Sequence, residues 1–205
     1  MSILFVFCLS GRGAAWLARL LWEQEVVSSN LTVPTIFSSF HPQMTAEEVI
    51  QALQLERHPE GGWYRRAYES EELVQLPRGE RSTNTSILYL LQEGEHSAWH
   101  SLVSEERWFF HDGGGVRLHL FGPGGYEEHR LGVKLEKGET PQVTIPPGVT
   151  FGAELTDPVQ WCLVGCTVCP GFDFADFSWG NAEDMERSYP GQAGLIRRLA
   201  RRFPF

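Results

Sequence analysis

The sequence has no long uninterrupted hydrophobic run and is short of basic residues. Its 205 residues contain no stretch near the roughly 18 apolar residues that a membrane-spanning helix requires, which excludes an integral membrane protein. Lys and Arg number 17 against 26 Asp and Glu, for a formal net charge of −9. Because proteins bind nucleic-acid phosphates through cationic side chains, we expect neither a nucleic acid nor a membrane as partner.

Cysteine is also scarce, with four residues in the chain. Only Cys166 and Cys169 stand at the Cys-x-x-Cys interval, whereas structural zinc sites usually pair two such motifs. On a strand, Cys162 and Cys166 would share one face and Cys169 the other, which predicts reduced core thiols rather than a metal site. Reduced thiols are typical of a cytoplasmic protein.

The pattern of the chain shows no alternation of strands with helices, which argues against a doubly wound α/β sheet. Instead, 21 Gly, 12 Pro, 13 Phe, 7 Trp and 5 Tyr supply the turns and short strands of a sandwich or barrel. We expect an all-β fold with a short helix near 45–55 and helical composition again at 181–202. The strands are expected near residues 62–68, 84–91, 97–103, 106–111, 116–121, 127–131, 142–146, 149–155 and 159–169.

The first 43 residues differ from the rest. Residues 11–35 resemble a transfer RNA gene translated by mistake, with the phrase VVSSNLT at 26–32. Met44 is followed by Thr45 and Glu48, a capping-box pattern that begins an amphipathic helix. We therefore expect a true start at Met44, a non-native or disordered extension over 1–43, and one domain over 44–205. An ordinary amphipathic extension is the alternative.

One spacing motif carries candidate chemistry. Gly94, His100, Glu106 and Gly113 stand at the intervals of a two-stranded hairpin, with the glycines at its turns. Alternate residues of a strand point to the same face, so a carboxylate on the returning strand is expected to face the histidine.

The sequence around this motif resembles that of a known family. The segments that carry the resemblance are, in chain order, HPEGGWY at 58–64, SAWH at 97–100, SEERW at 104–108, PQVTIPPG at 141–148 and LVGCTVCPGFDF at 163–174. Over about 45–180 the chain resembles the small single-domain cupin family of unknown function, similar in fold to the sugar-nucleotide epimerases of the jelly-roll class. The resemblance implies a cupin double-stranded β-helix that pairs as a homodimer, with no established activity.

A cupin metal centre normally takes three imidazoles and a carboxylate. Here His100 and Glu106 match, Leu102 stands in place of the second histidine, and Phe151 in place of the third. Two ligands make a weak divalent site. We therefore expect no cofactor and no metal, with His100 and Glu106 as a weak alternative.

His100 and Glu106 form the best candidate catalytic pair. A carboxylate beside an imidazole orients it and raises its pKa, which prepares a general base. In an epimerase, His100 would take a proton alpha to a carbonyl and a tyrosine, Tyr64 or Tyr89, would return one. The structural alternative is a buried His–Glu pair that stabilises the hairpin.

The barrel mouth is expected to bind a small polar or sugar-like ligand between aromatic rings. For each ring, packing in the core is the alternative. Two functions stay open: an epimerase or isomerase, and a non-catalytic binding or sensing module; a metal-dependent enzyme is third. The expected ligand-binding residues are Glu60, Trp63, Tyr64, Trp99, Trp108, Phe110 and Phe151.

Overall fold

The computed structural model describes residues 44–156 and 160–201. The predictions for 1–43, including the start at Met44, lie outside the described residues. Within the described ranges, no helix is long and apolar enough to cross a membrane.

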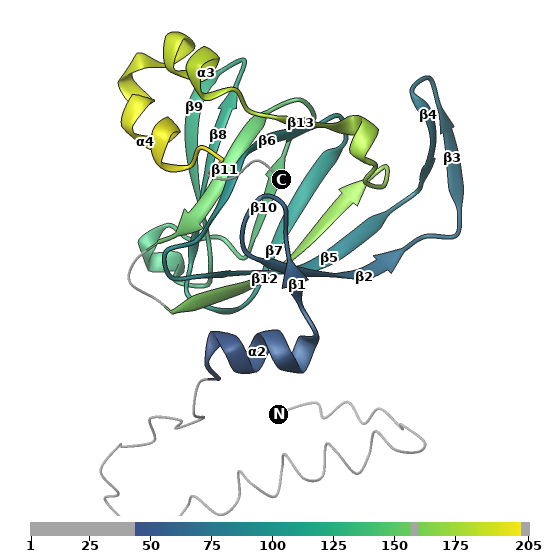
Figure 1. Cartoon of the computed structure of the whole chain (residues 1–205), viewed down its shortest axis with the longest axis horizontal. Coiled ribbons are helices and arrows are strands. Elements are labelled where there is room, and N and C mark those ends of the chain that lie inside the picture. Colours follow the sequence, from purple (N-terminus) through teal and green to yellow (C-terminus); the bar gives the residue numbers. More distant parts are fainter. Residues whose placement is uncertain (1–43, 157–159, 202–205) are drawn as a thin grey trace, which may run out of the picture. The chain divides into compact units, whose positions relative to one another are not determined.

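Two antiparallel sheets face each other and form the barrel (Figure 1). The first sheet has the strand order β1 (Glu56–Arg57), β2 (Trp63–Glu69), β5 (Thr85–Gln92), β12 (Trp161–Cys169), β7 (Glu105–Gly113) and β10 (Gln142–Ile145). The second has the order β13 (Phe177–Trp179), β6 (His96–Leu102), β11 (Thr150–Leu155), β8 (Val116–Gly122) and β9 (Gly125–Leu131). Strands distant in sequence are neighbours in both sheets, as a jelly roll requires.

Helices lie outside the sheets. Helix α2 (Ala46–Leu53) begins with the expected capping box, in which Thr45 and Glu48 satisfy each other's backbone N–H groups. Near the C-terminus, helices α3 (Ala182–Ser188) and α4 (Ala193–Arg198) follow the last strand. Three short 3₁₀ turns complete the structure: η1 (Leu135–Lys137), η2 (Phe174–Asp176) and η3 (Pro190–Gln192).

The all-β cupin architecture is confirmed, and every predicted strand corresponds to an observed one. The sequence reading missed β1, β13 and the hairpin of β3 (Leu73–Leu76) and β4 (Gly79–Ser82), which extends away from the barrel in Figure 1. Its strands expose most side chains, so they carry little of the hydrophobic alternation that marks a strand.

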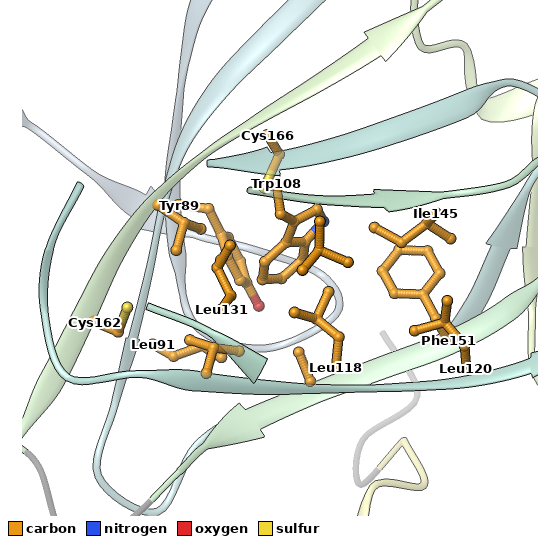
Figure 2. Packing of buried hydrophobic residues seen from close by; sticks show 14 of the residues in the cluster. Tyr89, Leu91, Trp108, Leu118, Leu120, Leu131, Ile145, Phe151, Cys162 and Cys166 are labelled. Carbon is orange, nitrogen blue, oxygen red and sulfur yellow. The ribbon is translucent and has the colours of Figure 1, made fainter. Parts of the chain in front are cut away.

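The barrel interior is filled by a cluster of buried apolar side chains from both sheets (Figure 2). Leu118, Leu131 and Phe151 are fully buried there, beside the rings of Tyr89 and Trp108. Cys162 and Cys166 belong to the same cluster as free thiols, whereas Cys169 is exposed. The prediction that Cys162 and Cys166 share the core face of one strand is therefore confirmed.

Candidate functional site

The apolar filling is incomplete at one part of the barrel, which leaves a cavity of about 100 Å³. Strands of both sheets and the segment 172–179 enclose it. An apolar cavity of about 150 Å³ holds one benzene molecule, so this space accommodates about four non-hydrogen atoms. The titratable side chains that line the cavity are His58, Glu60, Tyr64, Arg66, Tyr89, Glu106 and Cys166.

A glycine turn places Glu60 at the cavity. Gly61 and Gly62 both have positive φ, at 109° and 74°. A Cβ at Gly61 would collide with the backbone oxygen of His96, and one at Gly62 would lie 2.6 Å from the oxygen of Leu90. The turn therefore depends on glycine at both positions for its conformation and for its close approach to the neighbouring chain. A second cavity of about 440 Å³ also has Glu60 in its wall.

The carboxylate next to His100 is Glu60, which corrects the expected pairing with Glu106. His100 Nε2 lies 3.4 Å from Glu60 Oε2, and His100 Nδ1 donates to the carbonyl oxygen of Ala98 at 2.8 Å. The backbone bond assigns the proton to Nδ1, so Nε2 presents its lone pair to Glu60. Ser97 Oγ also donates to Glu60 Oε2, at 3.2 Å.

Burial sets the protonation of this pair. Desolvation lowers the pKa of His100 to about 4, although the bond to Ala98 opposes it. Desolvation and the nearby Glu106 charge raise the pKa of Glu60 well above its ordinary value. Near pH 7 the imidazole is therefore neutral, and burial favours the protonated form of Glu60. The expectation that a carboxylate raises the imidazole pKa is wrong here, because desolvation is the largest influence on this pKa and lowers it.

Glu106 faces the cavity from β7 and has neutral partners. Trp108 Nε1 donates to its Oε1 at 2.9 Å. Burial raises the pKa of Glu106 to about 7, and hydrogen bonds from Trp108 and Cys166 oppose the shift. The carboxyl is thus poised to gain or lose a proton near neutral pH.

Both candidate tyrosines line the cavity. The Tyr89 hydroxyl donates to the carbonyl oxygen of Gly61 at 2.7 Å, and burial raises its pKa well above the ordinary value. His58 packs edge-on against the rings of Tyr64 and Tyr89. Burial lowers the pKa of His58 to about 3, so this imidazole is also neutral at pH 7.

Of the expected site residues, Glu60, Tyr64, Tyr89, Glu106 and Trp108 line the cavity. His100 does not line it; its ring stacks at 5.5 Å between centroids on Phe177, which does. Like His100, four further expected residues, Trp63, Trp99, Phe110 and Phe151, do not line it.

Each of these four residues packs in another part of the molecule. Trp63 packs with helix α2, under the guanidinium of Arg57. Trp99 points to the C-terminal helices, where its Nε1 donates to the carbonyl oxygen of Ile196 at 2.8 Å. Phe151 is fully buried in the core, and Phe110 packs against that core.

Sequence reasoning missed the aromatic wall that follows Gly171. The lining residues of that wall are Phe172, Phe174, Phe177 and Trp179. The signal was four aromatic residues within eight positions, in a segment whose hydrophobic period matches neither a helix nor a regular strand. Buried Asp176 holds this segment, because Arg78 and Arg81 both donate to its carboxylate at 2.9 to 3.0 Å.

The donor set does not fit a cupin metal centre. Leu102 lines the cavity where a second imidazole would be needed, and Phe151 occupies the place of the third. His100 directs Nε2 to Glu60 rather than into the cavity. Among residues 44–156 and 160–201, no group of three His, Cys, Asp or Glu side chains is arranged to hold a metal ion.

The model of the family described as Cupin superfamily (DUF985) matches residues 47–180. This match spans more than half of the chain, so the protein belongs to that family. It includes the turn that carries Glu60, the strand that carries Glu106 and the aromatic segment after Gly171.

Three similar proteins have names that state no activity. A hypothetical protein from Leishmania major is 33% identical, with a TM-score of 0.70 over 77% of this chain and 99% of its own. A crystal structure of a Shewanella oneidensis protein is 37% identical, with a TM-score of 0.71 over 77% and 98%. The uncharacterised protein YML079W of Saccharomyces cerevisiae is 23% identical over 158 residues, which cover 70% of this chain and 79% of its own.

Proposed function

We propose that this cupin-family protein is a binding module that holds a small polar molecule, or the polar head of a larger one, in its barrel cavity. The observation that carries the proposal is a cavity with buried polar groups among aromatic rings. Glu60, Tyr89 and Glu106 bring titratable groups to a space otherwise walled by rings and aliphatic side chains. Small-molecule sites in proteins have this composition, with few polar groups that fix the orientation of the ligand.

Burial of polar groups costs free energy, which supports a binding role. Glu106 is 7% exposed and Glu60 has an 11% exposed side chain, yet neither forms an ion pair with an Arg or Lys among the described residues. A core that served packing alone would be more stable with apolar residues at these positions. Retention of two carboxyl groups at one cavity is typical of a functional site.

The epimerase hypothesis has less support than binding. A general base must reach its substrate, whereas His100 lies outside the cavity lining with its Nε2 directed to Glu60. A tyrosine that returns a proton must also be free to release it, and the Tyr89 hydroxyl is engaged with Gly61 and has a raised pKa. We therefore favour ligand binding over catalysis as the function of the cavity.

A cavity-filling variant tests the proposal. Ile87 lines the cavity from β5, so Ile87→Trp should reduce its volume, whereas Leu135→Trp adds the same ring at a position that is 68% exposed on η1. Saturation-transfer NMR against a panel of monosaccharides, small amines and small carboxylates measures binding. We expect at least one class to bind the parent and Leu135→Trp proteins, and to lose tenfold or more in affinity to Ile87→Trp. Equal binding to all three proteins would place the ligand outside the barrel.

The homodimer and the cytoplasmic location stay predictions. Both sheets end in strands with one unpaired edge, and such edges invite pairing with a second copy. Size-exclusion chromatography with light scattering of residues 44–205 tests the dimer. A mass equal to one chain across a hundredfold range of concentration would contradict it.

A further inference from the structure

The walls of the barrel cavity are made largely of aromatic rings. The rings that line it from both sheets and from the segment after Gly171 are Tyr64, Tyr89, Trp108, Phe172, Phe174, Phe177 and Trp179. An aromatic face carries partial negative charge and attracts a cation placed over it. One of these rings already contacts a cation, since the Arg201 guanidinium lies 4.3 Å from the centroid of the Trp179 ring.

Two buried carboxyl groups face the same space without a cationic partner. Glu106 bonds to the neutral donors Trp108 and Cys166, and Glu60 to Ser97 and neutral His100. Among the described residues, no Arg or Lys forms an ion pair with either carboxyl. The arginine that does line the cavity, Arg66, donates to Glu69 Oε2 at 2.7 Å, and its side chain is 42% exposed.

We propose that the cavity selects a small organic ammonium ion, held between the Glu60 and Glu106 carboxyl groups and the surrounding aromatic rings. This inference rests on the proposed function and names its ligand class. The volume of about 100 Å³ suits a head group of four or five non-hydrogen atoms, such as a methylated ammonium. A pyranose ring with its hydroxyl groups has about twice the atoms of benzene and exceeds this space.

The charge balance of binding follows from the protonation of the empty cavity. Burial favours the protonated form of Glu60, and Glu106, with a pKa of about 7, is protonated in part near pH 7. A bound cation favours the carboxylate, so its entry displaces a carboxylic proton to the solvent and leaves an ammonium–carboxylate pair. Binding should therefore release protons and strengthen as the pH rises toward and through 7, by up to about tenfold per pH unit.

Other groups facing the two carboxyls do not produce this dependence. His58 and His100 have pKa values of about 3 and 4 and stay neutral above pH 5. Burial raises the pKa of Tyr89 and of the Cys166 thiol well above their ordinary values, so both keep their protons.

Isothermal titration calorimetry with two probes of one shape tests the inference. Choline carries the charge, and 3,3-dimethylbutan-1-ol replaces its nitrogen by carbon. Each is titrated at pH 6 and pH 8 in two buffers of different ionisation enthalpy, which measures proton release. We expect choline to bind at least ten times more tightly than the alcohol at pH 8, to weaken about tenfold or more at pH 6, and to release a proton.

Two variants assign the effect to the cavity. Glu106→Gln keeps an oxygen for Trp108 Nε1 but cannot ionise, and should lose tenfold or more in choline affinity together with most of its pH dependence. Glu139→Gln is the matched control, because Glu139 is also 7% exposed but bonds to the Lys134 backbone and does not line the cavity. Glu139→Gln should bind choline as the parent does.

The outcomes separate the ligand class from the binding function. Equal affinity for choline and the alcohol, or choline binding without proton release, overturns the cationic ligand but leaves a binding cavity. Binding of monosaccharides with no binding of choline does the same. If neither probe nor any monosaccharide binds, the cationic ligand is overturned and the binding function loses its support as well.

Discussion

Two carboxyl groups in this barrel are buried to nearly the same extent and have opposite electrostatic environments. Asp176 is 5% exposed and Glu106 is 7% exposed. Asp176 receives hydrogen bonds from Arg78 and Arg81, which lower its pKa. Glu106 receives them from an indole and a thiol, and burial raises its pKa to about 7. At Asp176 the cationic partners outweigh desolvation, whereas at Glu106 desolvation outweighs the neutral partners.

The difference indicates two roles. The Asp176 network connects the β3–β4 hairpin to η2 and so fixes the aromatic segment that forms one wall of the cavity. Its charges are satisfied within the protein, as a structural role requires. Glu106 has no such partner and faces the cavity, so its charge is available to a ligand. The predictions below test this contrast.

The largest expected effect on stability follows from removing the Asp176 carboxylate. Asp176→Asn removes the charge that Arg78 and Arg81 share and leaves the buried Arg81 with only its longer ion pair to Asp173, at 4.0 Å. We expect the melting temperature to fall by about 5 °C or more. Glu106→Gln at pH 6 is the control, and should change it by less than about 2 °C because Glu106 is then mostly protonated. Equal losses would remove the distinction between the two carboxyls.

The pH dependence of stability should have opposite signs for the two groups. The pKa of Glu106 is raised in the folded state, so its contribution is present below the unfolded pKa of 4.5 and is lost as the pH rises through about 7. Relative to the parent, Glu106→Gln should therefore gain about 2–3 kcal/mol of unfolding free energy between pH 5 and pH 8. Asp176 has a lowered pKa, and its contribution is lost only as the pH falls below 3.8.

Urea unfolding of the parent and Glu106→Gln proteins at pH 5 and pH 8 measures this difference. A constant difference between the two proteins at both pH values would show that Glu106 ionises as an ordinary exposed glutamate does.

The smallest expected effect concerns the mouth of the cavity. Phe174 is 72% exposed, so Phe174→Ala should leave the unfolding free energy within about 0.5 kcal/mol. Because its ring lines the cavity, choline affinity should fall by about three- to tenfold. Leu135→Ala, also exposed but away from the cavity, should change neither quantity. Loss of stability without loss of affinity would make Phe174 a packing residue.

The strands could be predicted from the sequence because a strand with one buried face has apolar residues at alternate positions. Strand β12 is an example, with Cys162, Val164 and Cys166 buried on one face. Glu106 could be found by its spacing from Gly94 and Gly113, which depends only on one hairpin. The β3–β4 hairpin could not be predicted, because its strands bury too few side chains to require alternating apolar residues.

The partner of His100 could not be predicted either. Glu60 lies 40 positions earlier, on a turn whose place depends on the packing of Gly61 and Gly62 against β5 and β6. The spacing motif offered Glu106 on the returning strand of the hairpin, but distance in sequence does not give distance across a barrel. The pKa of His100 was missed for a related reason, since desolvation depends on every element packed around the ring.

The central claim is that Glu106 is a buried carboxyl whose charge awaits a cationic ligand. Carbon-13 NMR of glutamate side-chain carboxyls over pH 4–9 tests it directly, with the Glu106 resonance assigned by its absence from Glu106→Gln. The account predicts a titration midpoint of about 7 in the parent protein, and a lower midpoint when choline is present at saturation. A midpoint near the ordinary value of 4.5, or one that choline leaves unchanged, would contradict it.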